Sequence, residues 1–203
     1  MKHHQSQLFS DSNPVEVINR DGRVRHQPEY LSIEEADALF SYLKCNLDWQ
    51  QRKIFIFGEW RQQPRLIAFL GNEEILYSYS GDTLRSILWP DEVAKIAVKL
   101  SREFNNEFNV VLANYYRNGE DSMGWHADNE AELGNNPMIA SISLGQPRKF
   151  KLRHRDGEQK NLVLEHGSLL TMSGECQQYW QHALPKTRTD GARINLTFRK
   201  IIA

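Results

Sequence analysis

The sequence contains only two cysteines among its 203 residues, and Cys45 and Cys176 form no CxxC pair. This low content excludes a disulfide framework and favours a reducing compartment such as the cytoplasm. No apolar run approaches the ~18 residues of a transmembrane helix, and no apolar stretch follows Met1, so we expect neither a membrane span nor a secretory signal. The net charge of −1 excludes a polycation, so any binding of nucleic acid would depend on a local basic patch.

Hydrophobic periodicity divides the chain into a part with helices and a later part with short strands. Ser32 and Glu35 form a capping-box pattern that predicts a helix ending near Cys45, and apolar residues at helical spacing after Pro90 predict a second helix. The aromatic, alternating segment 52–60 is typical of a strand that turns at its glycine. Short β-prone segments separated by turn residues follow, and they cover 109–117, 138–144, 148–154, 161–165, 168–173 and 192–201.

This order of elements predicts an α+β, mainly β protein with a single domain. Residues 108–203 are expected to form an all-β sandwich or jelly roll. Residues 31–107 would pack helices against this core. The polar residues 1–30 would form an arm that covers the domain or is partly disordered.

Three residues form a candidate metal site. In an extended segment His126 and Asp128 point to the same side, because side chains alternate along a strand. A third ligand must come from another strand, and we expect it to be His182. Two histidines and one carboxylate on one face are the arrangement of non-haem Fe(II) oxygenases, which leaves positions open for oxygen and a cosubstrate. Zinc is the alternative metal, and surface loop residues without a metal are the structural alternative.

Near the C-terminal end, polar and apolar residues alternate on a predicted strand. Ile194, Leu196 and Phe198 would share the face that packs into the protein, and the other face would point into a cavity. That face carries two arginines with an amide and a hydroxyl between them, a set that suits a carboxylate ligand because guanidinium binds carboxylate bidentately. A solvated strand with scattered charge is the alternative interpretation. The four residues of this face are Arg193, Asn195, Thr197 and Arg199.

A basic row is predicted on another strand. Lys149, Lys151 and Arg153 would share one face of it, and such a row can follow a phosphate backbone. Arg65 would extend this patch. The alternative is an ordinary solvated strand face.

Taken together, these residues resemble the AlkB-like Fe(II)/2-oxoglutarate dioxygenases, and most closely the members that repair DNA. The similarity runs from about Phe55 to Ile201 and implies a double-stranded β-helix core with helices packed on it. The segments that carry the resemblance are Asn114-Tyr115-Tyr116-Arg117, His126-Ala127-Asp128-Asn129-Glu130, Ile139 to Gly145, His166-Gly167-Ser168-Leu169-Leu170, His182-Ala183-Leu184-Pro185 and Arg193 to Arg199.

The resemblance implies roles for the residues of the site. Fe(II) would be bound by His126, Asp128 and His182. Arg193 would hold the distal carboxylate of 2-oxoglutarate, and Arg199 would lie near the carboxylate beside the keto group. The other expected contacts to 2-oxoglutarate are Asn114, Tyr116, Asn195 and Thr197.

The resemblance also places a nucleotide-recognition hairpin region within residues 31–107. Tyr77 and Tyr79 would line the pocket for the damaged base, and Glu130 would lie near its exocyclic edge. Phe57 would either act as a wedge that fills the gap left by a flipped base or pack as a core aromatic residue.

The implied reaction is oxidative demethylation of bases such as 1-methyladenine and 3-methylcytosine in DNA. It would require Fe(II), consume O2 and 2-oxoglutarate, and release succinate, CO2 and formaldehyde. The same chemistry on RNA or on a protein is an alternative. A non-enzymatic metal-binding jelly roll is a further alternative, although it does not need the two arginines. We expect a monomer whose partner is alkylated DNA, single- or double-stranded.

Overall fold

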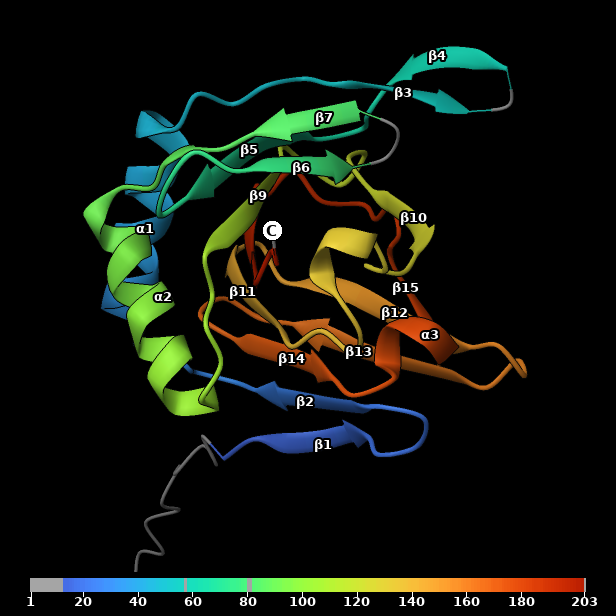
Figure 1. Cartoon of the computed structure of the whole chain (residues 1–203). Coiled ribbons are helices and arrows are strands. Elements are labelled where there is room, and N and C mark those ends of the chain that lie inside the picture. Colours follow the sequence, from blue (N-terminus) through green and yellow to red (C-terminus); the bar gives the residue numbers. More distant parts are fainter. Residues whose placement is uncertain (1–12, 57, 80–81, 203) are drawn as a thin grey trace, which may run out of the picture.

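Two β-sheets stacked face to face form the centre of the protein, for which a computed structural model describes residues 13–56, 58–79 and 82–202 (Figure 1). The side chains of residues 55–56, 78–79 and 82 are outside this description. The large sheet has the strand order β1-β2-β14-β11-β16-β9-β5-β8, and the small sheet has the order β10-β15-β12-β13. Neighbouring strands are antiparallel except β5 and β8. This double sheet confirms the predicted jelly-roll class.

The strands of the large sheet are β1 (Val15–Ile18), β2 (Arg23–Gln27), β14 (Leu169–Ser173), β11 (Ile139–Gly145), β16 (Arg193–Arg199), β9 (Val110–Tyr116), β5 (Leu66–Gly71) and β8 (Ile87–Leu88). Those of the small sheet are β10 (Met123–His126), β15 (Trp180–Leu184), β12 (Arg148–His154) and β13 (Gln159–Leu164). Two further hairpins pair β3 (Lys53–Ile56) with β4 (Glu59–Gln62) and β6 (Leu76–Tyr79) with β7 (Asp82–Arg85). All six strands predicted after residue 108 are present.

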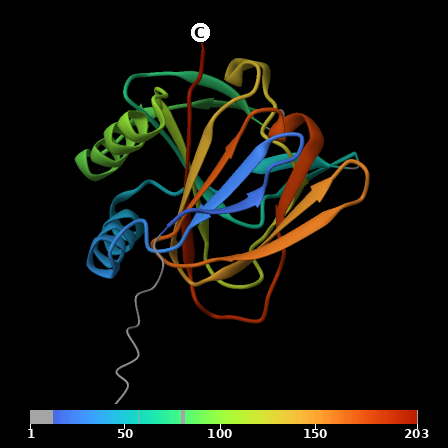
Figure 2. The same ribbon diagram turned by 90° about the horizontal axis from the view of Figure 1, so that it is seen from below.

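Two 14-residue helices cover the outer face of the large sheet, α1 (Ile33–Asn46) and α2 (Asp91–Phe104) (Figure 2). The predicted capping box is confirmed, because Ser32 Oγ accepts from the Glu35 amide while the Glu35 carboxylate accepts from the Ser32 amide. A short α3 (Cys176–Tyr179) and the 3-10 turn η1 (Ala131–Leu133) complete the helical elements. None of the described helices has the length and apolar character needed to cross a membrane.

Apolar residues pack on both faces of the large sheet. Ile194, Leu196 and Phe198 of β16 are fully buried in a core that also contains residues of α1 and α2. A second core lies between the two sheets, where Leu152 of β12 and Met172 of β14 belong to one cluster. The helix-facing side of β16 is therefore apolar, as predicted, and its polar side is left facing the small sheet.

The expectation of an N-terminal arm was wrong for residues 15–27. They form β1 and β2, and β2 pairs with β14 so that Val24 lies opposite Met172. Val24 is fully buried, whereas its neighbours Arg23 and Arg25 are exposed. The exposed arginines of β2 make the segment look polar, but they alternate with the buried residues Val24 and His26. This period of two is that of a half-buried strand.

The hairpins β3–β4 and β6–β7 lie at the end of the sandwich where β10 ends (Figure 1). Gly58 lies in the turn of the first hairpin with a φ of 81°, a conformation that favours glycine, which confirms the turn predicted at this residue. These hairpins occupy the region in which nucleotide recognition was expected.

Candidate metal centre and dicarboxylate pocket

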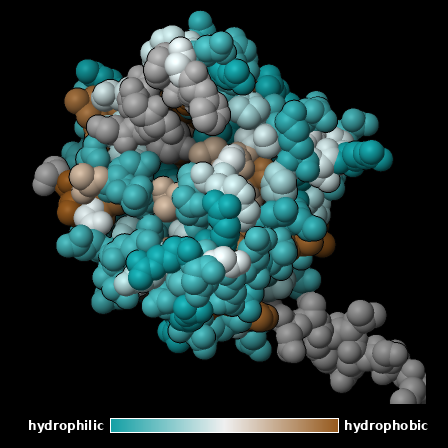
Figure 3. All heavy atoms as spheres, turned by 90° about the vertical axis from the view of Figure 1, so that its right-hand side faces the viewer, coloured by the Kyte–Doolittle hydropathy of each residue, from teal (hydrophilic) through white to brown (hydrophobic). Residues whose placement is uncertain are grey.

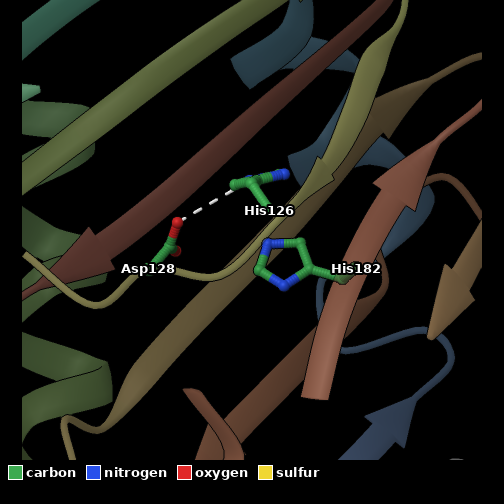
Figure 4. A group of neighbouring side chains, drawn as sticks. All are labelled: His126, Asp128 and His182. Atoms are coloured by element: carbon green, nitrogen blue, oxygen red, sulfur yellow. Dashed lines mark ion pairs between the residues drawn. The ribbon is translucent and has the colours of Figure 1, made fainter. Parts of the chain in front are cut away.

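The two histidines of the site are direct partners across two strands of the small sheet. His126 ends β10 and lies opposite His182 of β15, and their ring centroids are 4.2 Å apart. Asp128 follows two residues after His126 and points at the same spot (Figure 4). One ligand atom from each of the three residues lies within 4.8 Å of the others. The structure thus brings together the three residues that were predicted to bind metal.

Both imidazoles have the form that binds a metal. His126 Nδ1 lies 2.9 Å from the carbonyl oxygen of Gly124. Because a carbonyl oxygen only accepts, the ring proton belongs on Nδ1 and the lone pair of Nε2 points into the site. Burial lowers the pKa of His182 to about 3 and also lowers the pKa of His126. The two rings are therefore neutral near pH 7.

Asp128 is held by a buried arginine on one side and open on the other. Its Oδ2 accepts from Arg199 Nη2 over 2.7 Å, and Gln177 Oε1 accepts from its backbone amide. Burial alone would raise the pKa of Asp128, but Arg199 and the two histidines outweigh burial and hold that pKa well below its usual range. Its Oδ1 is buried without a hydrogen-bond partner and lies 3.7 Å from His126 Nε2. An orphaned anionic oxygen beside two imidazole nitrogens fits a divalent cation.

The polar side of β16 forms the opposite wall of the site. Arg193 Nη2 donates to Ser143 Oγ, and Asn195 Nδ2 donates to Ser141 Oγ, so serines of β11 orient the strand's polar side chains. Thr197 in turn donates to the amide oxygen of Asn195. All four predicted β16 residues are buried yet line one pocket, together with Asn114 and Tyr116 of β9 and with the metal triad.

This pocket explains how a metal and a dicarboxylate can share one site. Burial lowers the pKa of Arg193 to about 10, so the guanidinium stays charged at neutral pH. The two arginines stand on one strand six residues apart, and Arg199 lies next to the triad. Two positive charges in one pocket suit a ligand with a carboxylate at each end, whereas a site for zinc alone would not need the second cation.

Four residues near the site were not anticipated from the sequence. Ser141 and Ser143 alternate with buried Ile142 and Leu144 on β11, which is the same signal that identified the polar face of β16. Gln177 belongs to the four-residue α3, which gives no helical periodicity. The fourth, Arg148, is the first residue of β12 and is 1% exposed. Its place in the sequence, directly before the basic row, concealed that it points inward.

The residues expected around the base occupy different depths. Glu130 is half-buried, and burial together with the nearby charge of Asp128 raises its pKa. Tyr77 is 1% exposed and stacks on Phe69 at 5.5 Å between centroids. Its hydroxyl faces Glu130. Its ring is packed in the core and its hydroxyl points toward the other expected base contact, so its place beside the damaged base remains a prediction. Phe57 and the side chain of Tyr79 lie outside the described residues.

The predicted basic patch is only partly on the surface. Arg65 is 2% exposed and donates from Nε to Asn114 Oδ1 over 2.7 Å, so its predicted contact with a phosphate backbone was wrong. The side of the molecule drawn in Figure 3 is largely hydrophilic. Lys149, Lys151 and Arg153 do share the outer face of β12. Among them Arg153 lies over the ring of Trp125, next to the metal ligand His126.

Comparisons with known proteins agree with this geometry. The profile of the 2OG-Fe(II) oxygenase superfamily matches residues 23–199. The human protein named alpha-ketoglutarate-dependent dioxygenase alkB homolog 3 is 35% identical over 209 residues, covering 91% of this chain and 72% of that protein. The cattle protein named DNA oxidative demethylase ALKBH2 is 35% identical over 181 residues, covering 83% of this chain and 65% of that protein. The chain thus spans about two thirds of the length of these relatives.

A solved structure titled "The structure of OsALKBH1" superposes with a TM-score of 0.63 and covers 92% of this chain and 100% of that one. With a sequence identity of only 16%, this superposition shows a shared fold and nothing more. Enzymes of the superfamily named by the profile use Fe(II), O2 and 2-oxoglutarate, and the triad and the two arginines fit these groups. The chain belongs to the 2OG-Fe(II) oxygenase superfamily, among its AlkB-like members.

Proposed function

We propose that this protein repairs alkylated DNA by oxidative demethylation of bases such as 1-methyladenine and 3-methylcytosine, with release of succinate, CO2 and formaldehyde. One observation carries the proposal. A single pocket holds both the metal triad and the dicarboxylate-binding arginines, in a chain that is 35% identical over 181 residues to a protein named a DNA oxidative demethylase.

The residues of the pocket divide the work between the two sheets. His126, Asp128 and His182 would hold Fe(II), which supplies the oxidising chemistry together with O2 and 2-oxoglutarate. Arg193 would bind the distal carboxylate, since its Nε is buried and unpartnered among the described residues. Arg199 would keep Asp128 ionised and oriented while it neutralises the second carboxylate. Burial of the whole set excludes bulk water from the reacting groups.

A methyl group on the Watson–Crick edge of a base reaches this pocket only when the base is flipped or unpaired. Glu130 is half-buried two residues after Asp128, and its carboxyl group would contact the exocyclic edge of the base. Trp125 is exposed and carries the Arg153 guanidinium 4.5 Å from its ring centroid. We propose that this pair contacts the strand beside the flipped nucleotide, with Lys149 and Lys151 further along the same face.

The test is a demethylation assay with the intact chain. The protein is loaded anaerobically with Fe(II) and 2-oxoglutarate and then exposed to air with an oligonucleotide that carries 1-methyladenine. Single-stranded DNA, duplex DNA and RNA of the same sequence are compared, and restored adenine, formaldehyde and succinate are measured by mass spectrometry. The control pair is Asp128→Ala, which removes a proposed ligand, and Glu120→Ala, which removes an exposed carboxylate paired with Lys186.

Adenine that forms with the wild type and Glu120→Ala but not with Asp128→Ala would support the proposal. Succinate without adenine would retain the oxygenase and reject the alkylated base as its substrate. Absence of both products would overturn the proposed function. A preference for the RNA strand would move the substrate from DNA to RNA.

A further inference from the structure

Two buried guanidinium groups flank one tyrosine ring at the end of the pocket away from the metal triad. Tyr116 ends β9 and pairs in register with Arg193 of β16. The Arg193 guanidinium carbon lies 5.3 Å from the Tyr116 ring centroid, and that of Arg148 lies 5.9 Å from the same centroid. The three residues are 4%, 2% and 1% exposed. Arg148 comes from β12 of the small sheet and is not part of the pocket wall.

Arg148 forms no direct ion pair with a carboxylate among the described residues, although the charge of Asp121 acts on it from further away. Its Nη1 and Nη2 donate to the backbone carbonyls of Asn118, Asp121 and Pro185. The Asp121 carboxylate is held instead by Arg117, through two bonds of 2.7 and 2.8 Å. In the part of the chain that the structure describes, no carboxylate oxygen lies within 4.0 Å of Arg148 or Arg193.

Two buried cations without a direct ion pair are costly to keep charged. Burial lowers the pKa of Arg148 and that of Arg193, and the charge of Arg148 contributes to the lowering at Arg193. A buried pair of this kind is stabilised when an anion arrives beside it. The anionic end of a dicarboxylate is the group that would enter here, because Arg193 and Tyr116 line the pocket and Arg148 lies next to both outside its wall.

We propose that Arg148 is a positioning residue for the distal carboxylate of 2-oxoglutarate. It lies beside the Tyr116 ring and adds a second positive charge to the one that Arg193 presents. Arg148 therefore contributes to the preference for a 2-oxo acid with two carboxylates over one with a single carboxylate. The inference rests on the 2-oxoglutarate dependence of the proposed function and not on its nucleic-acid substrate.

A purely structural role is the competing explanation. Arg148 joins the loop after β9 to the loop after β15 through its carbonyl contacts, so its loss would also loosen the pocket floor. A loosened pocket would bind both kinds of 2-oxo acid more weakly, whereas loss of the charge would weaken only the binding of the diacid. The two roles are separated by the charge and the hydrogen-bonding capacity of the replacement side chain.

The experiment measures binding rather than turnover. Calorimetric titrations of the Mn(II)-loaded intact chain compare 2-oxoglutarate with 2-oxopentanoate, which has the same carbon chain and a methyl group in place of the distal carboxylate. Arg148→Gln keeps hydrogen-bond donors without the charge, and Arg148→Lys keeps the charge. We expect Arg148→Gln to weaken the binding of 2-oxoglutarate about tenfold. The affinity for 2-oxopentanoate should change by less than about twofold. Arg148→Lys should retain most of the affinity for 2-oxoglutarate that the glutamine variant loses.

The matched control is Arg117→Met, which releases the same loop through Asp121 without touching Tyr116. The inference would be overturned if Arg148→Gln lost affinity for both acids equally, or if Arg117→Met lost affinity for 2-oxoglutarate alone. Arg148→Met serves as a second neutral variant if the glutamine variant does not fold. A wild type that shows no preference for the diacid also rejects it, whatever the variants do. A wild type that binds neither acid rejects the proposed function itself.

Discussion

Arg199 Nη2 donates to Asp128 Oδ2 over 2.7 Å, and the two side chains are 4% and 2% exposed. The arginine stands on β16 of the large sheet, while Asp128 follows β10 of the small sheet, 71 residues earlier in the chain. One ion pair therefore joins the metal side of the pocket to its cosubstrate side. The arrangement leaves Oδ1 as the oxygen that points toward the histidines.

Replacement of Arg199 should weaken metal binding although Arg199 is not a ligand. Without the guanidinium, burial would raise the pKa of Asp128, and protons would compete with the metal for the carboxylate. We expect Arg199→Met to lower Mn(II) affinity about 10- to 100-fold, the usual effect of removing a group that orients a ligand. Anaerobic titration measures the affinity, and Arg102→Met on the exposed face of α2 is the control. Equal affinities in all three proteins would disprove the link.

The N-terminal hairpin should stabilise the whole domain. Val24 of β2 is fully buried in the core between the sheets, whereas Val15 of β1 is 57% exposed. Val24→Ala should cost about 2 kcal/mol in the free energy of unfolding, because it leaves a cavity in a packed core. Val15→Ala should change that free energy by less than about 0.5 kcal/mol. Urea titrations of both variants measure the difference, and equal costs would show that β2 packs loosely.

The two cysteines should differ in reactivity. Cys45 is exposed on α1, whereas burial raises the pKa of the Cys176 thiol to about 12. The thiolate is the reactive form, so one thiol per native chain should react with a thiol reagent at pH 8 and two should react after denaturation. Rapid reaction of two thiols in the native protein would contradict the burial of Cys176.

The same thiol gives a pH dependence of stability. A raised folded pKa keeps Cys176 protonated above its ordinary value of 9.0, at which the unfolded thiol ionises. Stability is therefore unaffected by this group below pH 9 and falls as the pH rises above 9, by at most about 1.4 kcal/mol for each pH unit. Cys176→Ala should lose this part of the alkaline decline. Unfolding free energies at pH 8 and pH 10 provide the comparison.

Arg153 should contribute to the binding of nucleic acid. Arg153 lies over the ring of Trp125, which precedes His126 in the chain, and its Nη2 donates a hydrogen bond to Gln181. Charge reversal in Arg153→Glu should weaken oligonucleotide binding and reduce the slope of log affinity against log salt by about one unit for the lost phosphate contact. Lys44→Glu on α1, which covers the opposite side of the large sheet, is the control. The double variant of Lys149 and Lys151 should act in the same direction.

Local patterns in the sequence predicted most of the site. The alternation of β16 predicted which of its side chains share the pocket, because a strand places every second residue on one face. His126 and Asp128 share a side for the same reason. The wrong expectations for Arg65 and residues 15–27 have a common origin, because each concerns how deeply a residue lies. The burial of a residue depends on which distant segment packs against it. Neither the residue type nor a local period of two in the sequence shows which segment that is.

The sequence by itself determined the residue types of the metal triad, the two arginines of β16, the capping box of α1 and the strands after residue 108. Tertiary structure alone decided that β2 joins the large sheet, that Arg148 lies beside the Tyr116 ring and that Arg199 pairs with Asp128. The first group depends on the local periodicity of helices and strands, which neighbouring residues fix. The second group depends on contacts between segments that are far apart in the chain, and only the packing of the two sheets brings those segments together.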